Sequence, residues 1–444
     1  MAAIQLGMVV SVMDASIINL ALPDITRDFG AASADAAWIV NAGQLATLGL
    51  LLPCAHLSER LGFRRVYQAG VVIFILGALC CVFAPSLAWL AAARALQGIG
   101  SAGMMAVNPA LVRLIFPGSG LGRALALNSV VVATSSVAGP SVAAVILSLA
   151  SWPWLFIAQL PLAVLVALLG RRLPTNPPRD GAALSPLDVV LNMAMFGLLF
   201  LGADVLGARS GRAADAAQWA GAAALLAAGL MVAVFYLRRQ RRLADPLFPV
   251  DLLRIPVFGL SMCASITAFA AQSLTFICLP FLLLQAQGRS HMEAGLIITA
   301  FPAAIVLAAP IAGRLIARVP AGLLGGLGMG LMALALAALA LLPAQPAAAA
   351  DIAWRMALGG LGFGLFQSPN NHTIVTSAPL RRAGAASGML ATARLTGQSA
   401  GAVLLGIIFS LRAVGDGGAT LALGLAAALA VAAALFSLLR VRAQ

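Results

Sequence analysis

Long apolar runs, separated by short polar segments, follow one another along almost the whole of this sequence. Each run is close to the roughly 20 residues that an α-helix needs to cross the hydrocarbon core of a bilayer. Fourteen such runs can be counted, near residues 4–23, 36–56, 66–84, 87–111, 123–148, 154–170, 187–206, 218–237, 257–284, 294–313, 321–342, 350–374, 385–411 and 417–438. The pattern predicts an all-α integral membrane protein with fourteen transmembrane helices.

The composition agrees with lipid as the solvent for most of the chain. Hydrophobic residues occupy 62% of the 444 positions and charged residues only 9%. A soluble domain of ordinary composition carries about 25% charged residues. No soluble core could bury this much apolar surface, so the apolar runs are expected to face lipid.

The basic residues are distributed as membrane topology requires. All 27 of them are Arg, and the formal net charge is +13. If the N-terminus is cytoplasmic, nineteen of these arginines fall in cytoplasmic segments and five in outer loops. By the positive-inside rule, this asymmetry predicts a multi-pass protein of the cell inner (plasma) membrane with both termini cytoplasmic. The arginines form no single basic face or arm, so no nucleic-acid partner is expected.

Several kinds of chemistry are disfavoured by the residues present. Without Lys, the chain can form neither a Walker-type phosphate loop nor a Lys Schiff base. The five Cys lack the CxxC spacing and the three His are isolated in sequence, so no metal site is expected. Residues 98–103, GIGSAG, match the GxGxxG pattern, but no strand precedes them and they indicate close helix packing instead.

The two flanking parts of the sequence repeat one another, which is a common design in secondary transporters. A shift of about 262 residues superimposes small and polar residues, namely Gly98, Gly100 and Asn108 on Gly360, Gly362 and Asn370. We therefore predict an N-terminal six-helix bundle at 1–172, linkers with two additional transmembrane helices at 173–256, and a C-terminal six-helix bundle at 257–444. Chance similarity among alanine-rich helices is the alternative to a repeat.

Three motifs, which occur in the expected order, resemble those of the major facilitator superfamily. Residues 55–65, AHLSERLGFRR, are similar to its G-x-L-a-D-R-x-G-r-r signature, and residues 94–102, RALQGIGSA, resemble its R-x-x-q-G-x-g-a motif. Residues 13–23, MDASIINLALP, resemble the first-span motif of the fourteen-span drug:proton antiporters. The resemblance implies the major facilitator fold, with two six-helix bundles and two additional central helices. It also implies a proton-coupled antiporter that exports small amphipathic molecules, with the proton gradient as energy source and no cofactor.

The sequence departs from the antiporter pattern at several positions. Gly139 and Pro140 of the antiporter motif are present, but Ala143 and Ala144 stand where a Gly pair is usual. Gly43 occupies a position where the family often carries Tyr. These changes leave the implied fold in place, but they weaken the inference of drug specificity.

Asp14 is the first candidate for proton coupling. It lies about ten residues, or ~15 Å, into the first span, where an ionisable residue is a functional candidate by default. Desolvation favours its protonated form and a neighbouring cation favours its ionised form, so its proton affinity can change with conformation. Arg94 differs from it in depth by only about 6 Å and is the expected partner. A neutral hydrogen-bonded Asp and a permanent, purely structural salt bridge are the alternatives.

The turn between the second and third spans predicts a cytoplasmic gate. An acid beside arginines at a helix junction can hold the N-terminus of a helix in the opposite half, and release it when the halves rock apart. The alternative is that the arginines of this turn only set the topology. The residues assigned to the gate are Glu59, Arg60, Gly62, Arg64 and Arg65.

Polar residues inside the apolar runs are candidates for the substrate cavity. Arg394 lies ~15 Å into the thirteenth span with no acid within a helical turn, so it could contact an anionic substrate or pair with an acid on another helix. The neutral candidates could line the cavity or simply bond to neighbouring helices. They are Asn19, Asn41, Gln44, Gln272, Asn370, Asn371 and Gln398.

Taken together, these features predict a secondary transporter whose partners are a small-molecule substrate, protons and the lipid bilayer, and which we expect to be a monomer. The leading hypothesis is the proton antiporter, and a uniporter, symporter or importer on the same scaffold is the nearest alternative. A single central acid suits a cationic substrate that competes with the proton, whereas Arg94 and Arg394 equally suit an anion. A non-transporting membrane enzyme or receptor is a remote alternative, because the sequence has neither a cluster of catalytic His or Asp at one interface nor a soluble sensory domain.

Overall fold

The computed structural model describes residues 1–30, 33–116, 120–176, 185–207, 216–243, 246–283, 287–289, 291–316, 318–342, 348–411 and 417–443. Throughout these residues the chain is helical, without a strand. Fourteen of the helices in this part of the chain have at least eleven residues, in agreement with the fourteen apolar runs of the sequence. The prediction of an all-α membrane fold is therefore confirmed.

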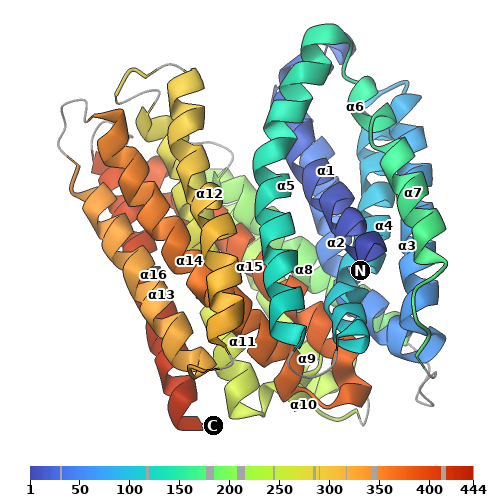
Figure 1. The fold of residues 1–444 in the computed structure, drawn as a ribbon. Helices are drawn as coiled ribbons and strands as arrows, with labels where there is room; N and C mark the ends of the chain where they lie inside the picture. The colour runs from blue at the N-terminus through green and yellow to red at the C-terminus, as the bar shows by residue number, and fades with distance from the viewer. Residues whose placement is uncertain are drawn as a thin grey trace.

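The first six predicted spans form one bundle, on the right in Figure 1. The sixth span is divided into a short and a long helix, because Pro161 cannot donate the backbone hydrogen bond that would continue the first into the second. The helices of this bundle are α1 (Ala2–Phe29), α2 (Ser33–Leu61), α3 (Phe63–Val82), α4 (Leu87–Ile115), α5 (Leu121–Leu149), α6 (Trp154–Ile157) and α7 (Leu160–Gly170).

The last six predicted spans form a second bundle, on the left in Figure 1. Its helices are α11 (Pro256–Phe281), α12 (His291–Leu315), α13 (Ala321–Ala340), α14 (Ala349–Ser377), η3 (Leu380–Arg382), α15 (Ala383–Leu411) and α16 (Ala419–Ala443). Between the bundles in sequence are α8 (Pro186–Gly207), α9 (Ala216–Gln240) and α10 (Val250–Leu253). The helices follow the three predicted segments of the chain, with α11 beginning one residue before the predicted start of the third, and the segment boundaries stay a prediction.

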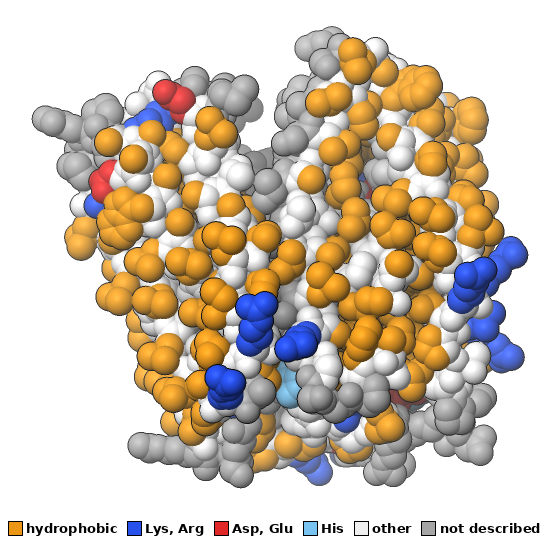
Figure 2. Space-filling view, viewed as in Figure 1, with side chains coloured by type: hydrophobic (Ala, Val, Ile, Leu, Met, Phe, Trp, Pro, Cys, Tyr) orange, Lys and Arg blue, Asp and Glu red, His pale blue; other side chains and the backbone are white. Residues whose placement is uncertain are grey.

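The two bundles meet at one end and part at the other. In Figure 2 they are in contact in the lower half of the view and separated by a notch at the top. The contacts between them run from α5 to α12 and α14, and from α2 and α4 to α15. The helix α8 packs on both α2 and α15, so the additional central pair covers the junction of the bundles. We call the end where the bundles meet the latch end, and the other the open end.

The outer surface of the bundles is apolar, as lipid requires. Figure 2 shows hydrophobic side chains over most of the visible face, with basic side chains concentrated towards the latch end. Large aliphatic residues such as Leu76, Val145 and Leu334 are 51%, 61% and 66% exposed. By their length and composition alone, seven of the described helices are long and apolar enough to cross a bilayer. Contiguous apolar exposure of this extent in the absence of lipid is the mark of a membrane-facing surface.

Glycines allow the fourth helix of each bundle to touch its neighbours. A Cβ atom on Gly98 of α4 would overlap the backbone carbonyl oxygen of Gly43 on α2. In the second bundle, a Cβ on Gly360 of α14 would overlap the carbonyl oxygen of Phe301 on α12. Small residues permit this backbone approach in membranes, where packing replaces the hydrophobic effect between helices. Because Gly98 and Gly360 are equivalent in the sequence repeat, the two bundles use the same packing device.

We expect Gly98→Ala to destabilise the folded protein by about 1–3 kcal/mol, because the methyl group would force the α2 and α4 backbones apart. The matched control is Gly330→Ala on α13, where an added Cβ meets no atom within 4 Å. That control should leave stability unchanged or raise it slightly, since Ala is a better helix former than Gly. Melting temperatures of the two purified variants check the pair, and equal values would contradict this packing argument.

Candidate functional site

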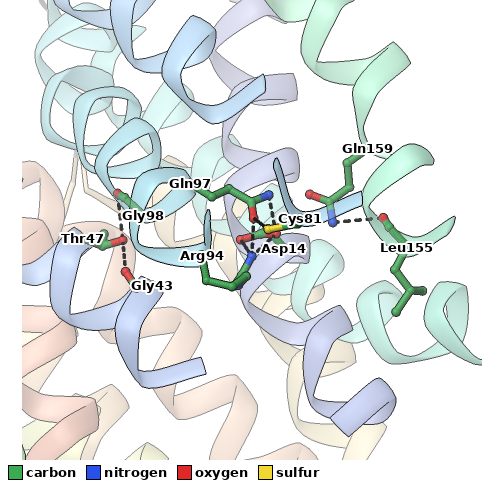
Figure 3. Close-up of polar contacts among 9 residues, drawn as sticks. All are labelled: Asp14, Gly43, Thr47, Cys81, Arg94, Gln97, Gly98, Leu155 and Gln159. Atoms are coloured by element: carbon green, nitrogen blue, oxygen red, sulfur yellow. Dashed lines mark hydrogen bonds and ion pairs between the residues drawn. The ribbon is translucent and has the colours of Figure 1, made fainter. Parts of the chain in front are cut away.

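The first part of the candidate site is an ion pair inside the N-terminal bundle (Figure 3). Asp14 on α1 and Arg94 on α4 are 6% and 4% exposed. Nη1 of Arg94 donates to both carboxylate oxygens of Asp14, at 2.7 Å to Oδ1 and 2.8 Å to Oδ2. The structure thus brings together the two residues that the sequence singled out for proton coupling, and their role in coupling stays a prediction.

Gln97, which was not among the residues predicted for proton coupling, completes this cluster. Its Nε2 donates to Oδ1 of Asp14 at 2.9 Å, while its Oε1 accepts from Nη1 of Arg94 at 2.6 Å. The signal for Gln97 was present, because it lies three residues after Arg94 on the same helix face and within the same quoted motif. Since an amide both donates and accepts, Gln97 can stay bonded to Asp14 in either protonation state.

The walls around the ion pair are apolar on one side and glycine-lined on the other. The Arg94 guanidinium carbon lies 5.9 Å from the centre of the Phe156 ring, within cation–π range. A Cβ on Gly43 would come within 3.5 Å of Nη2 of Arg94, so the absence of a side chain there leaves room for the guanidinium. The departure from the family's usual Tyr therefore lies directly beside the ion pair. Thr47 ties the same helices together, because its hydroxyl donates to the carbonyl oxygens of Gly43 and Gly98.

This cluster can exist in two chemical states. Protonation of Asp14 removes the negative charge that Arg94 requires, and a buried charge without a counterion is costly. The guanidinium must then find another acceptor or become accessible to water. A proton on Asp14 therefore changes which arrangement of α1 and α4 is favourable, and this dependence is what a proton-driven conformational change needs.

The second part of the candidate site joins the two bundles at the latch end. Glu59, near the end of α2, is 4% exposed, and its Oε1 accepts a hydrogen bond from the backbone N–H of Ala385 at 2.8 Å. Ala385 lies in the first turn of α15, where backbone N–H groups lack helical partners and the helix dipole favours an anion. Gly384 leaves space for this contact, because a Cβ there would lie 2.8 Å from Cγ of Glu59. Glu59 therefore holds a helix N-terminus of the opposite bundle.

Two arginines, Arg382 and Arg113, strengthen this latch, and in the sequence they are only part of the excess of arginine in the predicted cytoplasmic segments. Nη1 of Arg382 lies 3.7 Å from Oε2 of Glu59, and its Nη2 lies 2.9 Å from Oδ1 of Asp251 on α10. Arg113 of α4 donates to the carbonyl oxygens of Val375 and Ala378 in the opposite bundle. These contacts join residues that are far apart in sequence, so hydropathy and loop charge gave no signal for them.

The other predicted gate residues have different positions. Gly62 forms the turn between α2 and α3 with a φ of 96°, a conformation that side chains rarely adopt. Arg60 and Arg64 are partly exposed and Arg65 is exposed. Among the ion pairs of the described residues, none includes these three arginines. The structure thus brings Glu59 but not the three arginines into the latch.

The predicted cavity residues differ in exposure. Gln44 is exposed, while Gln272, Asn371, Arg394 and Gln398 are partly buried. Gly139 is buried on α5. The side chains of Asn19, Asn41 and Pro140 lie outside the described part of the structure.

Asn370, one of the predicted cavity residues, belongs to a hydrogen-bond network inside the C-terminal bundle. Its side chain is 0% exposed, and its Oδ1 accepts from Nη1 of the equally buried Arg440 at 2.6 Å. Its Nδ2 donates to the hydroxyl of Ser265 and to the carbonyl oxygen of Ser261 on α11. Arg440, which we expected in a cytoplasmic tail, is buried because α16 continues to Ala443.

The repeat equivalent of Asn370 makes a matching contact in the other bundle. Asn108 of α4 is 2% exposed, and its Nδ2 lies 3.4 Å from the carbonyl oxygen of Ile4 on α1. In each bundle, an Asn on the fourth helix therefore ties that helix to the first. A structural role follows for this pair of positions, and an amide in an apolar run does not by itself indicate a cavity.

Comparison with known proteins agrees with this architecture. A family model of the Major Facilitator Superfamily matches residues 4–402 and, in a further match, 262–443. The chain belongs to the Major Facilitator Superfamily. Membership confirms the resemblance drawn from the three motifs, and it identifies the chain as a membrane transporter and not an enzyme.

Relatives within the superfamily differ in what their names describe. The chain is 48% identical over 440 residues to the uncharacterized transporter YebQ of Escherichia coli, covering 99% of this chain and 94% of that one. It is 27% identical to the riboflavin transporter RibZ of Clostridioides difficile, covering 88% and 83%. It is 28% identical to the multidrug resistance protein Stp of Mycobacterium tuberculosis, covering 92% and 75%. Among solved structures, the human organic anion transporter MFSD10 superposes with a TM-score of 0.70 over 98% of each chain, at 15% identity, and so supports the fold.

Glu59→Gln should weaken the latch of this superfamily member, because a neutral amide loses the attraction to the α15 N-terminus and to Arg382. Spin labels at Arg65 and Leu380, both solvent-exposed at the latch end, report the separation of the bundles in a background without native Cys. In double electron–electron resonance, we expect Glu59→Gln to show a several-fold larger population of long distances between the two spin labels than wild type. Asp351→Asn, which removes an ion pair within α14, is the control and should keep the wild-type distribution. A wild-type distribution for Glu59→Gln would show that the latch does not hold the bundles together.

Arg440→Gln should lower stability by about 2 kcal/mol or more, because it removes charge-assisted hydrogen bonds and leaves buried acceptors unpaired. The wild-type guanidinium donates to Ser261, Asn370, Ala321 and Ser437. The comparison is Arg355→Gln, which breaks a partly exposed pair within one helix and should cost under about 1 kcal/mol. Thermal unfolding of both variants checks the difference, and a smaller loss for Arg440→Gln than for Arg355→Gln would refute it.

Proposed function

We propose that this transporter is a proton-coupled antiporter that exports small amphipathic molecules from the cytoplasm by alternating access. The observation that carries the proposal is the buried cluster of Asp14, Arg94 and Gln97. In this cluster, the carboxylate Asp14 of one transmembrane helix is paired with the cation Arg94 on a different helix of the same bundle. Intramembrane acids of this kind form proton relays in transporters.

The latch end is the cytoplasmic end in this proposal, with both termini on that side. The excess of arginine in the segments at this end supports the orientation. The conformation described here, with the bundles joined at the latch and apart at the open end, is then an outward-facing state (Figure 2). In this state a proton from outside reaches the interior, while the substrate path to the cytoplasm is closed.

A chain of contacts can link the proton site to the latch. Asp14 binds Arg94 on α4, and α4 is in backbone contact with α2 where Gly98 meets Gly43. Glu59 lies sixteen residues further along α2, about 24 Å by helical rise. A tilt of α4 upon protonation of Asp14 would therefore shift α2 and displace Glu59 from the first turn of α15.

The substrate class rests on the composition of the interior and on the relatives. Beyond the polar contacts of the latch, part of the interface between the bundles is apolar, namely the cluster of Leu51, Ala55, Met105, Ala106 and Ala391. A multidrug resistance protein among the relatives supports the export of amphipathic molecules.

We place the protein in the inner membrane as a monomer with lipid as its surroundings and no nucleic-acid partner.

A uniporter or symporter for another small metabolite is the second candidate. It is favoured by the relative that is named as a riboflavin transporter. The same scaffold and the same latch would serve either activity, so only the coupling of substrate flux to protons distinguishes the two.

The decisive experiment measures the pH gradient of inverted vesicles while compounds from a panel of amphipathic cations, anions and neutral molecules are added. For wild type we expect a transported compound to collapse the gradient. For Asp14→Asn we expect coupling to fall at least about tenfold while downhill transport persists, since the two conformations remain accessible without the proton step. Asp28→Asn is the matched control, because Asp28 lies on the same helix, is exposed, and bonds to Trp152 through an oxygen that Asn retains.

The outcomes separate the candidates. Coupled flux in Asp14→Asn at the wild-type level would make Asp14 structural and defeat the mechanism. Downhill transport by wild type without any effect on the gradient would favour the uniporter.

A further inference from the structure

Arg394 is a cation inside the protein, in the region between the two bundles. It lies on α15, nine residues beyond Ala385 and therefore about 14 Å from the latch towards the open end. Its Nη2 points to the opposite bundle, where it lies 4.0 Å from the sulfur of Met105 on α4. The residue is of intermediate exposure.

The protein supplies no counterion to Arg394 within the described residues. A thioether is a weak acceptor, and Met105 itself packs in an apolar cluster with Leu51, Ala55, Ala106 and Ala391. The other arginines with ion partners pair with Asp14, Asp188, Asp351, Asp251 and Glu59.

The two other described carboxylates, Asp28 and Glu293, are not paired with Arg394. Asp28 accepts from Trp152, and Glu293 lies in the first turn of α12. A guanidinium in apolar surroundings without an acid is costly for the fold, which makes it a functional candidate.

The Asp14–Arg94 pair lies at a different depth in the membrane and does not neutralise the charge of Arg394. Met105, which Arg394 contacts, lies eleven residues after Arg94 on α4, or about 16 Å along the helix axis. The Asp14–Arg94 pair is thus a separate, internally neutral unit. The interface at the level of Arg394 therefore attracts anions and repels cations, because low-dielectric walls concentrate the field of a single charge.

We propose that Arg394 is the anion-binding residue of the substrate site, and that the exported molecule is a small amphipathic organic anion, such as a carboxylate or sulfonate on an apolar body. This inference rests on the proposed export function and specifies its substrate class. The planar guanidinium can bind a carboxylate or sulfonate with two parallel hydrogen bonds. The apolar cluster that includes its contact Met105, together with Leu51 and Leu395, suits the rest of such a molecule.

Two dyes with the same ring system test the charge preference directly. Fluorescein is an amphipathic anion and rhodamine 6G an amphipathic cation, and fluorescence anisotropy measures the binding of each to the purified full-length protein without any gradient. We expect fluorescein to bind wild type at least about tenfold more tightly than rhodamine 6G, and Arg394→Gln to weaken fluorescein binding about tenfold or more. Arg394→Lys should keep part of the affinity, and Arg394→Glu should reverse the order of the dyes.

Arg355→Gln is the control, since it removes an arginine that pairs with Asp351 within its own helix, and it should bind both dyes as wild type does. A melting temperature for Arg394→Gln within the wild-type range ensures that lost binding is not lost folding. Tighter binding of rhodamine 6G to wild type, no binding of fluorescein, or unchanged fluorescein affinity in folded Arg394→Gln would each overturn the proposal.

The result is independent of proton coupling. Binding is measured at equilibrium, and Asp14 is remote from Arg394 along the membrane normal. Failure of the pH-gradient experiment would refute antiport and leave the anion site standing, whereas failure of the dye experiment would refute the anion site and leave antiport standing.

Discussion

The low dielectric of the membrane interior constrains the charged side chains that are buried in this protein. Water is not there to solvate an ion, so the protein must supply its partners. The chain meets this constraint in three ways. Asp14 is paired with Arg94, Glu59 is bound by a helix N-terminus, and Arg440 is surrounded by neutral oxygens. The first two arrangements depend on helices that can move relative to each other, whereas the third links four helices of one bundle.

The two bundles share a scaffold and differ in their chemistry. Gly98 and Gly360 allow the same close packing, and Asn108 and Asn370 tie the fourth helix of each bundle to its first. The acid–base pair occurs in the N-terminal bundle, while the C-terminal bundle contains the neutral network around Arg440. A symmetric frame with asymmetric charges lets one bundle respond to protons while the other keeps its internal shape, and a rocking motion between rigid bodies requires this combination.

Most of the fold could be predicted from the sequence, because spans are read from hydropathy alone and fourteen runs became fourteen long helices. The pairing of Asp14 with Arg94 followed from similar depth on separate spans, and the contact of Glu59 with a helix N-terminus followed from its place at a helix junction. Asn370 and Arg440 could not be placed, since depth does not reveal which face of a helix a residue occupies or how far the last helix extends. The partnership of Arg382 with Asp251 depends on where α10 lies, and no local pattern encodes that position.

Distance between charges decides how protons and substrate can be coupled. A proton on Asp14 and an anion at Arg394 attract each other, and strong attraction would favour carrying both together, which is symport. At about 16 Å and an effective dielectric of about 20 the attraction is only about 1 kcal/mol. Coupling free energies between sites are typically 1–3 kcal/mol, so this attraction is at the lower limit of that range and is too weak to fix the direction of exchange by itself. The coupling must then arise from the conformation that each ligand favours, transmitted by α4 and α2 to the contact between Glu59 and α15. Separation of the two charges is thus what makes antiport of an anion physically possible on this scaffold.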